Sequence, residues 1–271
     1  MTNTPKVIYY CWFGKGPLST TAQKCIKSWK KFAPEYEIVC CNEDMFDVES
    51  CHWTRAAYAA GKFAYVADYV RFWLIYNYGG VYMDTGSELV KDISALCAEC
   101  SPFSAIEELS KTATTGLIVA APPFNPVVAE VLAAYDAMEF SDDSEFLRAH
   151  TVNEMFTNVL EKHGFIRENK RQKVGEWTFL PSTAFNPVYG FGGFHIKKDT
   201  YSVHHYSSSW MEPKFKTKRA VVDKLSPFTG RRIAQIVGRA VGELKHEGLS
   251  KGLSNLVQVL HAVISRSKFS N

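Results

Sequence analysis

The sequence predicts an α/β fold, an open β-sheet with helices on both faces, followed by a C-terminal helical appendage. A strand at 6–13, an amphipathic helix ending before Pro34 and a second strand at 36–41 make a β-α-β opening, which favours a parallel sheet. Farther on, a helix at 61–78 stops at a double glycine and leads into a short strand that ends on an acid. The last 59 residues form a tail with two amphipathic helical patterns.

Each element follows from a local pattern. In the first helix, Ala22, Ile26, Trp29 and Phe32 recur at steps of three and four residues. The helix at 61–78 is apolar or aromatic on nearly every side, so we expect it to be buried. The remaining predictions are a core strand at 117–121, helices at 127–138 and 153–163, strand-like pieces between 177 and 204, and two amphipathic helices at 233–244 and 249–264.

Composition and charge predict a globular body at 1–212 and a basic tail at 213–271. The chain has 271 residues with 46% hydrophobic and 22% charged residues, enough to bury a core. Its net charge of +3 divides into −6 for the body and +9 for the tail. It has no run of 18 apolar residues and no apolar signal core after the first residues, so we expect neither a spanning helix nor a secretory signal.

The seven cysteines predict a reducing, cytoplasmic location. They are odd in number and scattered, which suits reduced core residues better than a disulfide framework. Cys97 and Cys100 have the C-x-x-C spacing but no second pair or nearby histidine, so we expect no zinc site there.

Three charged residues are candidates for chemistry. Asp68 and Arg71 lie three apart on the helix at 61–78, hence on one flank, and either form a structural ion pair or face a cleft. Asp84 ends the following strand, where open α/β sheets bind ligands and where a carboxylate suits Mg²⁺ or Mn²⁺ on phosphate oxygens. A plain turn residue is the alternative reading of Asp84.

Three ordered motifs carry a family resemblance. The segment 64–91 (AYVADYVRFWLIYNYGGVYMDTGSELVK) resembles the core of glycosyltransferases with a D-x-D sugar-binding motif, closest to the family of yeast initiating mannosyltransferases and bacterial capsular polysaccharide transferases. The opening IYYCWFG at 8–14 and VHHYSSSW at 203–210 resemble the same family's first strand and closing motif.

The resemblance implies a GT-A (Rossmann-like) nucleotide-sugar-binding fold, a retaining transfer, and a divalent cation, Mn²⁺ or Mg²⁺, on the donor diphosphate. It also implies roles for residues at matching positions. Trp12 would stack on the base, Asp68 and Arg71 would hold the donor sugar, and Tyr82 would line the nucleotide pocket. Asp84 would be the first acid of the motif, His205 a metal ligand, and Ser208 and Trp210 the pair that closes over the diphosphate.

Gly86 departs from that pattern, because it stands where the family has its second acid. We expect an altered metal site in which Glu88 joins Asp84 and His205; a weaker site of Asp84 and His205, or cationic side chains without metal, are the alternatives. Because His204 and His205 are adjacent in a strand, only one ring can enter the cleft, and His204 is the second choice.

These observations predict an enzyme that moves a hexose from a UDP- or GDP-sugar to a glycan or lipid-linked saccharide in capsule or surface polysaccharide synthesis. The alternative is a catalytically weakened protein that binds a sugar nucleotide or glycan. The twelve lysines and arginines of the tail suggest contact with an anionic membrane, on its inner face, although packing on the body is the usual role of such helices. We expect no nucleic-acid partner, because the body is acidic and has no recognisable binding module.

Overall fold

The chain divides into two compact units. The computed structural model describes residues 4–187, 195–205 and 213–248. The first unit, here called the body, comprises Met1–Pro187 and Ile196–Ser207, and the second, the tail unit, comprises Val188–His195 and Ser208–Asn271. The expected boundary between residues 212 and 213 stays a prediction, because 206–212 lie outside the described residues.

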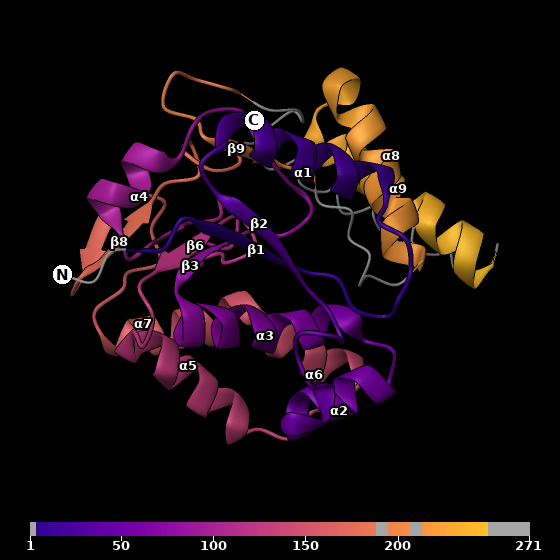
Figure 1. Ribbon diagram of the computed structural model, residues 1–271. Coiled ribbons are helices and arrows are strands. Elements are labelled where there is room, and N and C mark those ends of the chain that lie inside the picture. Colours follow the sequence, from indigo (N-terminus) through magenta and orange to yellow (C-terminus); the bar gives the residue numbers. More distant parts are fainter. Residues whose placement is uncertain (1–3, 188–194, 206–212, 249–271) are drawn as a thin grey trace. The chain divides into compact units, whose positions relative to one another are not determined.

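The body is built on a seven-stranded sheet and contains a second, two-stranded sheet (Figure 1). The order in the large sheet is β2-β1-β3-β6-β5-β8-β7, and β4 pairs with β9 in the small one. The strands are β1 (Val7–Cys11), β2 (Glu37–Cys41), β3 (Gly80–Tyr82), β4 (Ser87–Leu89), β5 (Phe103–Ala105), β6 (Val119–Ala121), β7 (Gln172–Val174), β8 (Trp177–Leu180) and β9 (Ser202–His204).

The predicted α/β class is confirmed, although the sheet is mixed rather than wholly parallel. β1 is parallel to β2 and β3, and β5 is parallel to β8, whereas β6 runs antiparallel to both of its neighbours and β7 runs antiparallel to β8. Antiparallel neighbours need only a tight turn. Between Val174 and Trp177 that turn is Gly175-Glu176, with Gly175 at a φ of 56°.

Helices cover both faces of the large sheet (Figure 1). Alternation along β1 sends Tyr9 and Cys11 into the core beneath α2, α3, α5 and α7, and Ile8 and Tyr10 into the core shared with α1 and α4. The helices of the body are α1 (Thr20–Phe32), the 3₁₀ turn η1 (Val48–Ser50), α2 (His52–Ala59), α3 (Phe63–Tyr78), α4 (Ser94–Cys100), α5 (Pro126–Asp136), α6 (Ser144–Ala149) and α7 (Val152–Lys162).

Helix α3 is buried, as its aromatic sequence predicts. Nine of its residues are buried, including Asp68 and Arg71. It ends where Gly79 adopts a φ of 66°, in the region that favours glycine, and Gly80 then starts β3. The helix and the strand that carry the candidate site are therefore joined by one turn.

The small sheet is held against α1. The indole N–H of Trp29 donates to the carbonyl of Ser87 at 2.7 Å, and the Ser28 hydroxyl accepts from the backbone N–H of Leu89 at 2.9 Å. In the β4–β9 ladder Ser87 stands opposite His204. This register decides which histidine faces Asp84.

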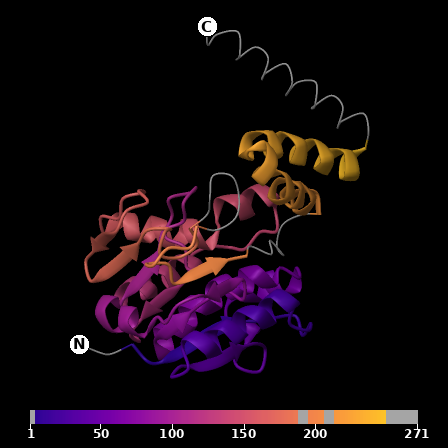
Figure 2. The same ribbon diagram turned by 90° about the horizontal axis from the view of Figure 1, so that it is seen from above.

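The described part of the tail unit is a hairpin of two helices, α8 (Pro213–Thr229) and α9 (Arg231–Glu247), which lie side by side (Figure 2). The sequence pattern predicts α9, whereas α8 was not anticipated. A Cβ at Gly238 would lie 2.6 Å from the carbonyl oxygen of Lys218, and one at Gly242 would lie 2.9 Å from that of Lys214, so glycine permits this close packing. The helix predicted at 249–264 lies outside the described residues.

All seven cysteines are free thiols, and six of them are buried. In the ranges that the structure describes, no helix combines the length and apolarity needed to cross a membrane.

Gly238→Ala should destabilise the hairpin although alanine is intrinsically the better helix former by about 1 kcal/mol. The added methyl group would meet the carbonyl oxygen of Lys218 and, at 2.8 Å, Cγ2 of Val222, so the helices would have to separate. Thermal unfolding followed by circular dichroism checks this against Gly16→Ala, a site with no atom within 4 Å of the added Cβ. Equal or higher stability of the Gly238→Ala hairpin would contradict the close packing.

Candidate functional site

The candidate site lies just past the carboxyl end of β3, where the chain turns from Tyr82 into β4. The backbone N–H of Asp84 donates to the carbonyl of Gly116 at 3.0 Å, and the N–H of Ser87 donates back to the carbonyl of Asp84 at 2.8 Å. The Ser87 hydroxyl also donates to Gly116, at 2.9 Å. These bonds fix the turn that presents the Asp84 carboxylate.

Arg71 of α3 forms the centre of the site. One of its terminal nitrogens, Nη2, lies 2.6 Å from Asp68 Oδ1 and 3.5 Å from Asp84 Oδ1. The other, Nη1, donates to the Thr115 hydroxyl at 3.0 Å. Its guanidinium carbon lies over the Tyr82 ring, 4.8 Å from the centroid, in a cation–π contact. The structure therefore brings three of the predicted residues, Asp68, Arg71 and Tyr82, together with Asp84.

Asp84 is the most accessible member of this cluster. Its side chain is 35% exposed, against 5% for Arg71 and 12% for Asp68. The Tyr82 hydroxyl donates to Asp84 Oδ1 at 3.0 Å. Asp84 is therefore the group that a ligand can reach, while the buried residues hold it in place.

Burial and charge together shift the pKa values of the cluster. Burial raises the pKa of Asp68 to about 7, with the nearby Asp84 adding to the rise and Arg71 opposing it. Burial alone would lower the pKa of Arg71, but Tyr82, Asp84 and Asp68 outweigh it and raise the pKa. Burial also raises the pKa of the Tyr82 phenol well above its usual value, so Tyr82 stays a neutral donor.

The connection between β5 and β6 provides two residues that the sequence analysis did not identify. Thr115 is the hydroxyl partner of Arg71. A Cβ at Gly116 would lie 2.2 Å from Asp84 Oδ2, so only glycine leaves room for the carboxylate in this position. The signal available in the sequence was a Thr-Gly pair just before a core strand, which on its own also fits an ordinary turn.

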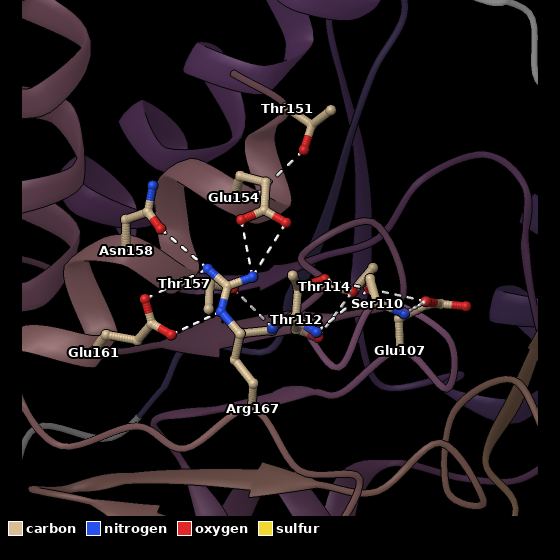
Figure 3. A network of polar contacts seen from close by, with 11 residues as sticks. Glu107, Ser110, Thr112, Thr114, Thr151, Glu154, Thr157, Asn158, Glu161 and Arg167 are labelled. Carbon is tan, nitrogen blue, oxygen red and sulfur yellow. Dashed lines mark hydrogen bonds and ion pairs between the residues drawn. The ribbon is translucent and has the colours of Figure 1, made fainter. Parts of the chain in front are cut away.

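Polar contacts anchor this connection to the body (Figure 3). Glu107 accepts hydrogen bonds from the backbone and hydroxyl of Ser110 at 2.7 and 2.8 Å. The Thr157 hydroxyl on α7 accepts from the backbone N–H of Ala113 at 3.0 Å. Next to it, Arg167 pairs with Glu154 and Glu161 at 2.9 and 2.7 Å. These contacts hold in place the segment that carries Thr115 and Gly116.

His204, the second choice of the sequence analysis, is the histidine beside Asp84. Its Nε2 lies 4.0 Å from Asp84 Oδ2. A Cβ at Gly86 would lie 3.0 Å from Cε1 and 3.1 Å from Nε2 of the same ring. The imidazole therefore occupies the space next to the backbone position where the motif has its second acid.

His205 and Glu88 are brought together, but away from Asp84. His205 Nε2 lies 2.6 Å from Glu88 Oε2, and Lys24 Nζ lies 2.8 Å from the same oxygen. Burial alone would raise the pKa of Glu88, but hydrogen bonds from Lys24 and His205 lower it. His205 directly follows the last residue of β9, and the two histidines contact different acids, as expected for neighbours along an extended chain.

Three predicted site residues remain, Trp12, Ser208 and Trp210. Trp12 is half-buried beyond the end of β1, and its indole N–H donates to the carbonyl of Gly16 at 2.7 Å. Ser208 and Trp210 lie outside the described residues.

Metal ligands occur here in pairs. Across residues 4–187, 195–205 and 213–248, no group of three His, Cys, Asp or Glu side chains is arranged to hold an ion. Asp84 with His204 offers one carboxylate and one imidazole, and Mg²⁺ or Mn²⁺ often takes only one or two protein ligands and completes its shell with phosphates and water. The donor set of this pair fits a cation that arrives with a diphosphate.

Thr115→Val should destabilise the body by about 1–3 kcal/mol, since it leaves a buried guanidinium N–H without an acceptor. Thr115→Ser keeps the hydroxyl and is the matched control. Urea unfolding at neutral pH measures both variants. If the valine variant is as stable as the serine variant, the hydrogen bond does not hold Arg71.

Asp68 should make the folded protein less stable as the pH rises. Its pKa is about 7 in the folded protein and near 3.8 in the unfolded chain, so the folded state binds more protons between these values. This contribution to stability is complete below pH 3.8 and is lost as the pH rises through about 7, at up to about 1.4 kcal/mol per pH unit.

Unfolding of wild type and Asp68→Asn at several pH values between 4 and 7 checks this expectation. The difference in free energy of unfolding should shift in favour of the variant as the pH rises. A constant difference across the range would show that Asp68 titrates normally.

The comparisons with known proteins bear on this same part of the chain. Residues 19–102 match the family model described as glycosyltransferase sugar-binding region containing DXD motif. Among solved structures, the PaToxG glycosyltransferase is similar at 16% identity with a TM-score of 0.47, covering 59% of this chain and 69% of that one. No curated protein matches the sequence.

The matched residues include α3, β3 and the turn at Asp84, and the mixed α/β body around them is consistent with a GT-A fold. Residues 19–102 thus resemble a glycosyltransferase sugar-binding region of the DXD type, with glycine in place of the second acid.

Proposed function

We propose that the protein transfers a hexose, with retention of configuration, from a UDP- or GDP-sugar to a hydroxyl of a glycan or lipid-linked saccharide. The observation that carries this proposal is the Asp84 carboxylate, accessible at the end of β3 and held by Arg71 and Tyr82 inside the matched sugar-binding region. A single exposed acid backed by buried partners is what an orienting group for a polar donor requires.

The reaction breaks the bond between the anomeric carbon and the diphosphate and forms one to the acceptor oxygen. Negative charge grows on the departing diphosphate, and one of its oxygens takes up the hydroxyl proton that the acceptor loses. Arg71 provides a permanent positive charge beside Asp84, and Asp68 and Thr115 keep that charge in one orientation. Because Arg71 is buried and paired, its role is to hold the Asp84 carboxylate in one position, so this group needs no rearrangement during the step.

A divalent cation, when bound, would neutralise charge on the diphosphate. Asp84 and His204 are the residues that would hold it, and this replaces the set of Asp84, His205 and Glu88 expected from the sequence. His205 and Glu88 instead pair with one another, and Glu88 also forms an ion pair with Lys24. In this proposal their role is to fix β9 to β4 close to the start of the closing motif.

Asp84→Asn should lower release of the nucleotide from a UDP- or GDP-sugar by about a hundredfold, because it removes the group that orients the donor. Glu176→Gln, a change at an exposed acid on the turn between β7 and β8, is the matched control and should leave the rate unchanged. The rates are measured by nucleotide release with a panel of acceptors, in Mn²⁺ and in EDTA. Equal rates for Asp84→Asn and the control would refute the assignment.

The two histidines separate the competing metal sites. His204→Ala should weaken Mn²⁺ binding in a titration followed by electron paramagnetic resonance, whereas His205→Ala should not. If instead His205→Ala weakens Mn²⁺ binding and His204→Ala does not, the metal ligand is His205, as the family position implies.

A protein that binds a sugar nucleotide without turnover is the second candidate. It is favoured by Gly86, whose missing carboxylate leaves the site with fewer acids than the motif normally has. Thermal shifts with UDP, GDP and CMP measure binding independently of catalysis, since a ligand of the folded state raises its stability. A clear shift without nucleotide release from any donor would support this candidate.

We further propose that the acceptor is a lipid-linked precursor of a capsule or surface polysaccharide, met at the inner face of a membrane. The support for this is the charge of the tail, +9 over residues 213–271 against −6 for the body. An acidic catalytic body with a basic tail suits an acceptor held at an anionic surface.

A further inference from the structure

The closed end of the α8–α9 hairpin exposes large apolar side chains. We call residues 224–233 the hairpin tip. Phe228, in the last turn of α8, is 85% exposed, the highest fraction of any large apolar side chain in the described ranges, and Ile233, in the first turn of α9, is 53% exposed. Only Gly230 separates the two helices, so these residues lie at the same end of the hairpin.

The hairpin is also strongly basic. Residues 213–248 contain nine lysines and arginines against three acids, a net charge of +6. Two of the acids are engaged within the hairpin, Glu243 with Arg239 at 2.9 Å and Glu247 with Lys214. At the tip, Lys224 is exposed, and the sequence adds Arg231 and Arg232 directly after the turn.

Packing within the hairpin does not account for the exposed residues. At Gly238 and Gly242, α9 approaches closely the stretch from Lys214 to Val222 of α8. Phe228 and Ile233 remain exposed despite this packing. Exposed apolar residues next to several basic residues are typical of protein segments that enter the headgroup region of an anionic bilayer. Each basic residue near such a surface contributes about 1 kcal/mol to the binding free energy.

We propose that the hairpin tip docks on an anionic lipid surface, with Phe228 and Ile233 entering the interface and the cations of the hairpin facing lipid phosphates. This docking goes beyond sugar transfer and does not require it. Because it depends on both apolar and charged residues, it should need anionic lipid and weaken at high salt.

Co-sedimentation of the full chain with phosphatidylcholine vesicles, with and without phosphatidylglycerol, tests the proposal. Wild type should bind only the anionic vesicles, and Phe228→Ser should reduce binding by at least about fivefold because it removes the largest inserted group. The matched control is Ile166→Ser, since Ile166 is 62% exposed but belongs to the body, and it should bind as wild type does.

A pair of charge reversals tests the electrostatic part. Lys224→Glu should lower binding to anionic vesicles by roughly fivefold or more, whereas Lys173→Glu, at an exposed position of β7, should not. Thermal unfolding verifies that each variant is folded, and all four variants should keep the thermal shift of wild type with nucleotides, so lipid docking and donor binding can fail separately.

Three outcomes would overturn the proposal. They are no sedimentation of wild type with anionic vesicles, undiminished binding of Phe228→Ser, and equal loss in the tip and control variants. Self-association in the absence of vesicles that Phe228→Ser abolishes would assign the tip to a second copy of the chain instead.

Discussion

The buried guanidinium of Arg71 is the interaction on which the rest of the site depends. A charge with this little exposure is tolerated only where it is paired and hydrogen-bonded, and here Asp68, Asp84 and Thr115 share that task while Tyr82 offers its ring. These partners come from α3, the end of β3 and the β5–β6 connection. The guanidinium of Arg71 thus connects three separate segments next to the Asp84 carboxylate.

The short β4–β9 ladder divides the polar residues around this centre into two pairs. Its register directs His204 to Asp84, and the next residue, His205, to Glu88 and Lys24 on α1. A shift of one residue would exchange these roles, because side chains alternate along a strand. The two sides of the ladder therefore receive different acid–imidazole pairs from adjacent positions in the sequence, His204 with Asp84 and His205 with Glu88.

Much of the body could be predicted from local patterns, with periodicity indicating α1, α3, α5 and α7, and composition with glycine and proline stops indicating the strands β1 to β3. The grouping of Asp68 with Arg71 followed from their helical spacing. The contribution of Thr115 and Gly116 could not be predicted, since it arises from the antiparallel placement of β6 beside β3. The choice between His204 and His205 depends on a register between distant segments. Helix α8 was missed because lysines interrupt its apolar pattern.

The contact between Gly86 and the His204 ring links two positions that are far apart in the sequence. A Cβ at 86 would lie 3.0 Å from the imidazole, so any side chain there would require the His204 ring to shift by a few tenths of an ångström. The residue at 86 and the position of the ring beside Asp84 are consequently coupled, and a change at one alters the space available at the other.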